Sequence, residues 1–298
     1  MSLDATIFDP AATVPDPLTA FERPDRAFYD TGVLLDAEDF LDEQTYHRSR
    51  LARALGYLTG AGTLVGLKAQ TDLNGGVLEL EVTAGLAVDR YGRLIEVPRP
   101  WCMRLQPWVS AQTNDALRGA HGATGVVADL YLVFAPAARG RTPAFAQGDF
   151  DATDALVPSR IRDAFQFSLV LRPEAKDAPA DAAFLPRGRF DAIRELAPAA
   201  RVDAMRQAVL DGWTESLARP RAPGDTDAVP PLREHALGVD PASIFLARVV
   251  MPTLAGPGAT PAGGRPDVDF ANLNDSCINN LSRSFAVPTD LLGAVFGA

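Results

Sequence analysis

Glu43 and His47 are the first pair of side chains whose types and spacing could do chemistry. They are four residues apart inside a segment with helical periodicity, so they share one helix face. A carboxylate and an imidazole in this arrangement could supply two metal ligands or an acid and a base. At the same spacing they also form an ordinary local helix pair, and His47 lies on the apolar stripe of the segment, where a half-buried structural histidine is common. We interpret the pair as structural.

A second group consists of short oxygen-bearing side chains in the stretch DVDFANLND, which covers 267–275. Its members are Asp267, Asp269, Asn272, Asn274 and Asp275. Such oxygens could bind calcium, but the stretch lacks the glycine at the sixth place and the glutamate at the twelfth place of a calcium loop. Turn formation and helix capping use the same residue types. The sequence therefore leaves ion binding here open.

Three tryptophans could stack on sugar rings. Trp101 ends a predicted strand and Trp213 lies on an apolar helical stripe, so we expect both to pack in the core. Trp108 has no periodic context, and its role stays open.

The common catalytic motifs are missing from the chain. It has no phosphate-binding G-x-x-x-x-G-K-[ST] loop, no dinucleotide-binding G-x-G-x-x-G, no H-E-x-x-H and no G-x-S-x-G. The histidines, His47, His121 and His235, fall in separate predicted elements, and Cys102 and Cys277 are too far apart for a cysteine-based zinc motif. We expect no catalytic residue, no cofactor and no metal site, and hence a protein that is not an enzyme.

Composition excludes further classes. The 298 residues carry a formal charge of -10, which disfavours broad binding to nucleic acid. No stretch approaches the roughly 18 apolar residues of a membrane span, and the first residues lack a signal-peptide pattern. We therefore expect a protein made in the cytoplasm.

The elements that must position these residues follow from periodicity. Residues 1–30 contain four prolines and predict an extended arm. Residues 36–58 predict a helix with Asp36 as N-cap, and its apolar stripe is expected to pack on the sheet that follows. The stripe comprises Phe40, Gln44, His47, Leu51, Leu55 and Leu58.

Alternation of apolar and polar residues over 63–105 predicts an antiparallel meander built from TLVGLKA, VLELEVT, GLAV and RLIEV. The apolar runs 126–136 and 165–173 predict central strands, and 244–251 predicts a further strand. Residues 186–219 predict one short and one longer helix, whereas 220–231 and 252–266 are Pro/Gly-rich loops.

Together these elements predict an α+β fold, with an antiparallel β-rich core arranged as a sandwich or barrel. The predicted organisation is an arm (1–30), a helix plus meander (31–110) and a β-rich domain with a helical insertion (111–298).

The segment 28–47 resembles the start of a family of bacterial proteins encoded with phage-tail-like contractile injection systems. The matching positions are Tyr29, Gly32, Leu34, Leu35, Ala37, Asp39, Phe40, Glu43, Gln44 and Tyr46. The resemblance continues through GLAVDRYGRLIEVP at 85–98 and, more faintly, through IFLARVVM at 244–251 and SRSFAVPTDLL at 282–292. It implies a structural or assembly component of a contractile tail, at its baseplate, with no catalytic residues.

The expected partners are other tail or baseplate subunits and symmetric copies of the chain itself in a tail-like particle. Extended proline-containing segments can dock on a neighbour at low entropic cost, so the arm and the two loops are the expected contact segments. The alternative is a module of such a particle that binds or hydrolyses cell-envelope glycans. Hydrolysis would need two converging carboxylates, and the acidic residues are too many to single out a pair.

Overall fold

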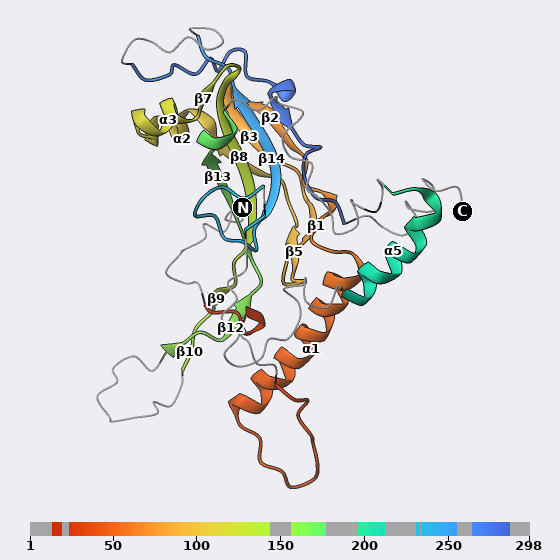
Figure 1. The fold of residues 1–298 in the computed structure, drawn as a ribbon. Helices are drawn as coiled ribbons and strands as arrows, with labels where there is room; N and C mark the ends of the chain where they lie inside the picture. Colours follow the sequence, from red (N-terminus) through yellow and green to blue (C-terminus); the bar gives the residue numbers. More distant parts are fainter. Residues whose placement is uncertain are drawn as a thin grey trace.

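The computed structural model describes residues 14–19, 24–143, 156–176, 193, 196–211, 231–232, 234–254 and 264–286. Within these ranges the chain combines helices with strands that all pair antiparallel, and the described strands close no barrel (Figure 1). The α+β prediction is confirmed. No helix in the described ranges is long and apolar enough to cross a membrane.

The largest sheet has the strand order β13-β8-β14-β15, with β7 also paired to β8. Its strands are β7 (His121–Gly122), β8 (Gly125–Phe134), β13 (Phe165–Leu171), β14 (Ile244–Met251) and β15 (Ile278–Asn279). β8 is buried on both faces, as its long run of mostly apolar residues predicts. β13 is only half-buried and lies at the edge of the described sheet, so the prediction of a central strand there is wrong.

The predicted meander forms two three-stranded sheets instead of one. The first has the order β1-β4-β5 and the second β2-β3-β6. The first contains β1 (Gly62–Gly66), β4 (Gly85–Val88) and β5 (Leu94–Val97); the second contains β2 (Ala69–Asn74), β3 (Val77–Val82) and β6 (Trp101–Arg104). β1 leaves β2 and pairs with β4 because the chain turns sharply at Gly66 and Leu67, whose φ angles are 66° and 54°.

Smaller elements complete the described chain. Two short strand pairs join β9 (Ala137–Arg139) to β12 (Arg160–Arg162) and β10 (Thr142–Pro143) to β11 (Leu156–Val157). The helices are α1 (Ala37–Leu58), α2 (Leu105–Ala111), α3 (Asn114–Gly119) and α5 (Pro198–Asp211), with 3₁₀ turns η2 (Pro17–Thr19), η3 (Pro173–Ala175) and η4 (Asp275–Cys277). α5 is the longer of the two helices predicted within 186–219, and it begins at Pro198. Most of the segment expected to hold the shorter helix lies outside the described residues.

A single hydrophobic cluster draws on both sides of position 110. It includes Leu80 and Val109 from one side and Leu130 and Leu246 from the other. Residues from 31–110 and from 111–298 therefore contribute to one hydrophobic cluster. The opposite face of β8 carries Asp129 and Tyr131 and is covered by residues that include Ala236 and Phe245.

A buried arginine ties the last described segment to this body. Arg283 donates to the carbonyl of Leu67 at 2.6 Å and to the backbone and side chain of Asn280, and burial lowers its pKa to about 10. Asn280 in turn bonds both backbone groups of Ala69 at 2.8 Å. These contacts hold residues 280–283 against the junction between β1 and β2.

Candidate interaction surface

The helix predicted at 36–58 is present as α1, and its start is capped as expected. The Asp36 carboxylate accepts hydrogen bonds from the backbone N–H groups of Glu38 and Asp39, and the Asp39 carboxylate accepts the N–H of Asp36. This reciprocal capping box satisfies donors that the first turn would otherwise leave unpaired. The start of α1 is therefore fixed by local sequence.

The face that α1 buries is not the predicted one. Thr45, Ser49 and Ala52 are buried, whereas Phe40 and Leu51 are 52% and 59% exposed. At 100° per residue, the buried face lies opposite the apolar stripe. The prediction that Phe40, His47, Leu51 and Leu55 pack on the sheet is wrong, although Leu55 is partly buried at the border of the stripe.

Close backbone contact explains why small residues face inward. The turn between β4 and β5 places Gly92 against Ala52, so that a Cβ atom on Gly92 would lie 1.8 Å from the Ala52 carbonyl oxygen. Gly92 also has a φ of 82°, which favours glycine. A leucine or phenylalanine stripe could not approach this turn so closely.

A chain of ion pairs fixes α1 to the sheet. Arg48 on α1 pairs with Asp16 at 3.2 Å, and Asp16 also pairs with Arg93 at 3.1 Å. Arg93 binds Asp89 at 2.6 Å, and its guanidinium lies 4.5 Å from the centroid of the Phe134 ring. Because Asp16, Asp89 and Arg93 are buried, α1 is held in one orientation, with its stripe outward.

The exposed apolar surface continues from α1 into the segment that precedes it. Leu58 is 84% exposed, and in the preceding segment Phe28 and Leu34 are 80% and 95% exposed. Tyr29, Val33 and Leu35 are exposed as well. Figure 1 shows α1 along the outer edge of the molecule, with residues 24–36 projecting beyond its N-terminal end. We call Phe28–Leu35 together with the stripe of α1 the α1 surface.

A groove runs beside this surface. Leu51 and Leu55 form one wall, and Leu94 and Ile95 of β5 contribute to the other. The groove has a volume of about 270 Å³ and also contacts Leu18 and Phe134. Its lining combines apolar residues with the charged side chains of Arg48, Arg93, Glu96 and Asp163.

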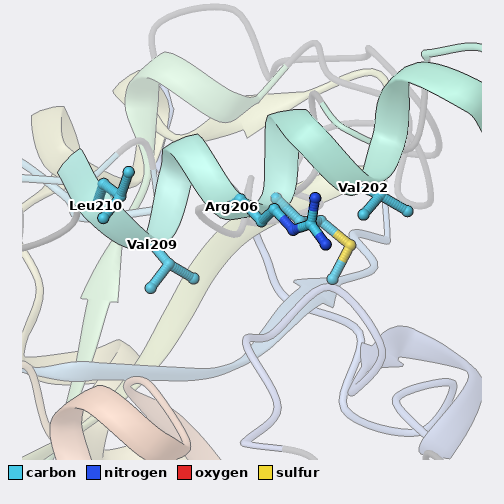
Figure 2. A pocket seen from close by; sticks show the side chains of 5 residues that line it. Val202, Arg206, Val209 and Leu210 are labelled. Atoms are coloured by element: carbon cyan, nitrogen blue, oxygen red, sulfur yellow. The ribbon is translucent and has the colours of Figure 1, made fainter.

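A second exposed apolar face lies on α5. None of the residues of α5 is buried, and Val202, Met205, Val209 and Leu210 recur at helical spacing along it. Figure 2 shows Val202 and Val209 projecting from one side of the helix, with Arg206 between them along its length. The apolar side chains of α5 are thus exposed, and Trp213, which we expected to pack in the core, lies outside the described residues.

Glu43 and His47 form the local helix pair that their spacing favours. His47 Nε2 lies 2.8 Å from Glu43 Oε1, and the His47 side chain is 65% exposed. His47 is therefore not the half-buried histidine expected from the stripe. Among the residues that the structure describes, no group of three or more His, Cys, Asp or Glu side chains is placed to hold a metal.

Four of the five Asp and Asn side chains of 267–275 make hydrogen bonds within the protein. Asp269 accepts from Asn272, Asn274 caps η4 through the N–H of Ser276, and Asp275 accepts from the backbone and hydroxyl of Thr71 on β2. These bonds hold the pKa of Asp275 below its usual value. The turn and capping functions considered for this stretch are the ones observed.

The described tryptophans contact the core. Trp101 stacks on Phe167 with ring centroids 4.5 Å apart, as predicted, and Trp108 is partly buried against the same hydrophobic cluster. The two cysteines are free. Neighbouring acids and partial burial raise the pKa of Cys102, which disfavours a reactive thiolate there.

One polar cluster was not predicted. Asp129, fully buried in β8, accepts two hydrogen bonds from Arg248 at 2.8 and 2.9 Å and one from Arg172 at 2.5 Å. Arg172 also donates to the Tyr131 hydroxyl, and burial raises the pKa of Tyr131. Every polar group of this cluster is paired with another. Such complete pairing is typical of a structural cluster, which here connects β8 with β14 and with the residue that follows β13.

Models of known protein families do not match this chain, and curated protein sequences yield no match either.

Proposed function

We propose that the protein is a structural or assembly component of a contractile, phage-tail-like particle, positioned at the baseplate and acting through contacts between subunits. The observation that carries the proposal is the α1 surface. Exposed apolar side chains recur along it, with Gln44 and His47 among them, and monomeric proteins rarely leave large apolar patches in water. It coincides with 28–47, the segment that carries the family resemblance.

The contacts that hold α1 in place indicate that its exposed apolar face serves an interaction and does not result from poor packing. The ion pairs of Asp16 and the Ala52–Gly92 contact hold α1 with its polar and small face inward. A helix held rigidly with its apolar face outward loses little entropy when a partner covers that face.

Part of the N-terminal arm packs against its own chain. Among the arm residues that the structure describes, Asp16 and Leu18 are buried, and the Val14 N–H donates to the carbonyl of Pro136. Within 24–30, Phe28 is 80% exposed and available to a neighbour. Residues 220–230 and 255–263, from the two proposed contact loops, lie outside the described residues.

The test is incorporation into particles. Tail-like particles purified from the source cells should contain the chain in fixed proportion to the other subunits. Leu51→Glu should fold normally, because Leu51 is exposed, and should be lost from the particles. Leu237→Glu is the matched control, since Leu237 is 99% exposed and is not part of the α1 surface, its neighbour Ala236 packing against Tyr131 of β8. Absence of the wild-type chain from such particles, or normal incorporation of Leu51→Glu, would overturn the proposal.

A further inference from the structure

We propose that the ribbon formed by β9 and β12 is a docking site for an acidic surface of a neighbouring protein subunit, which its arginines bind through carboxylate groups. This inference rests on the proposed function and adds to the α1 surface a second contact of different chemistry. It is argued from the sign of the charges on the ribbon, from the face on which they lie and from the repulsion between two of them.

The ribbon is a basic region of an acidic protein. The chain as a whole has a formal charge of -10. The described segments 137–143 and 156–162, which contain the ribbon, have no acidic residue but hold four exposed arginines, Arg139, Arg141, Arg160 and Arg162. Figure 1 shows β9 and β12 extending beyond the end of β8, away from the other strands of the large sheet. A positive region in this position attracts a negatively charged partner.

Three of these arginines share one face of the ribbon. β9 and β12 pair antiparallel, with Arg160 opposite Arg139 and Arg162 opposite Ala137. Residues directly opposite each other project to the same face, and so do residues two apart on one strand. Arg139, Arg160 and Arg162 therefore form one basic face, while Ile161 projects from the other face.

The direct opposition of Arg139 and Arg160 indicates that the basic face serves a partner. The Cβ atoms of directly opposite residues are about 4.5–5.5 Å apart, and like charges at such positions destabilise a strand pair. Among the residues that the structure describes, no carboxylate is paired with either arginine. Asp163, the acidic residue that follows the ribbon, lies 3.8 Å from Arg48 of α1. A carboxylate supplied by a partner between the two guanidinium groups would replace this repulsion with two attractions.

The surroundings of the ribbon favour a protein partner over a nucleic acid. Guanidinium groups bind carboxylates and phosphates alike. The net negative charge of the chain repels the continuous phosphate backbone of a nucleic acid. The sequence between the two strands adds three further acids, Asp149, Asp151 and Asp154. A protein surface can place a few carboxylates against the basic face and neutral groups elsewhere.

Binding of a fluorescent oligoglutamate peptide to the full chain, measured by anisotropy at low ionic strength, tests this chemistry. Arg139→Glu combined with Arg160→Glu should raise the Kd by more than about tenfold. Arg99→Glu combined with Arg118→Glu is the matched control, because it changes the net charge equally at exposed positions outside the ribbon. This control should bind like wild type.

Three outcomes of the binding experiment would overturn the inference. The first is a wild-type chain that does not bind the peptide. The second is an equal loss of affinity in the two double variants, which would show that net charge alone acts. The third is tighter binding of a short DNA duplex than of the peptide, with the same dependence on Arg139 and Arg160, which would make the ribbon a nucleic-acid site.

The melting temperature distinguishes docking from a structural use of the arginines. Arg160→Glu places a carboxylate opposite Arg139, and opposite charges at this position attract. The single variant should therefore melt at the same or a higher temperature than wild type while it binds the peptide more weakly. A lower melting temperature with unchanged binding would show that the arginines stabilise their own fold, and the inference would be wrong.

The two proposals fail in distinguishable ways. In particles, Arg139→Glu combined with Arg160→Glu should be lost, whereas Arg99→Glu combined with Arg118→Glu should be retained. If the ribbon variant enters particles like wild type, the inference is wrong and the assembly function still stands. If the wild-type chain binds the peptide through the ribbon but is absent from particles, carboxylate binding stands and the assembly function is wrong.

Discussion

The backbone of Ala52 on α1 and Gly92 in the turn between β4 and β5 are in direct contact, and this contact decides which face of α1 is buried. No side chain fits between them, because a Cβ atom at Gly92 would meet the Ala52 carbonyl oxygen at 1.8 Å. The small face of the helix is consequently the only one that can approach the turn, and the larger apolar side chains must point away.

Gly92→Ala should therefore destabilise the protein by at least about 2 kcal/mol, from the clash together with an unfavourable positive φ. Gly76→Ala is the matched control. Gly76 has nearly the same φ, 83°, with no atom within 4 Å of the added Cβ, so it reports the backbone strain alone. Urea unfolding of both variants gives the difference. Equal losses of unfolding free energy in Gly92→Ala and Gly76→Ala would show that the contact between Gly92 and Ala52 is not tight.

Leu51→Ala should lower the free energy of unfolding by less than about 1 kcal/mol, because Leu51 is 59% exposed. Leu80→Ala, at a fully buried position of β3, should cost about 2–5 kcal/mol. Thermal melts of the two variants under conditions where the chain is monomeric compare them. A loss at Leu51 as large as that at Leu80 would place the stripe in the core.

The periodicity of 36–58 predicted the helix correctly, but it did not predict which face of the helix is buried. A helical apolar stripe shows that one face avoids water, yet it does not distinguish a stripe that packs on the same chain from one that packs on another. The contact that decides the question, between Ala52 and Gly92, joins residues forty positions apart and depends on a glycine that the sequence marks only as a turn. The pairing of β1 with β4 was missed for a similar reason, since the turn at Leu67 requires a positive φ in a residue that rarely adopts one.

Asp129→Asn should destabilise the protein by roughly 3–5 kcal/mol, because it leaves Arg172 and Arg248 buried without their shared carboxylate. Sequence reasoning could not find this cluster, since Asp129 stands within an apolar run and its partners are on other strands. Glu174→Gln removes the other carboxylate that pairs with Arg172. The Glu174 side chain is 49% exposed, so this change should cost at most about 1 kcal/mol. The free energy of unfolding of the two variants is measured with urea. Similar losses would contradict a structural role for the buried ion pairs of Asp129.

His235 should make the protein less stable in mild acid. It is buried, its Nδ1 accepts the Leu232 N–H at 2.8 Å, and its Nε2–H is left to donate to the Ser243 carbonyl at 2.9 Å. This pattern needs the neutral ring. Burial, aided by Arg90, lowers the pKa of His235 below its usual 6.5, against the opposing effects of the Ser243 carbonyl, Glu234 and Asp240.

Below about pH 6.5 the unfolded chain therefore binds a proton at His235 that the folded chain does not, and stability falls as the pH is lowered further, by up to about 1.4 kcal/mol per pH unit. His235→Gln should lose this part of the pH dependence, although it also lowers stability near neutral pH. His47→Gln, at an exposed position, should retain it. Urea midpoints measured from about pH 7.5 to about pH 5.5 make the comparison. An unchanged slope in His235→Gln would mean that His235 takes up a proton as readily in the folded chain as in the unfolded chain.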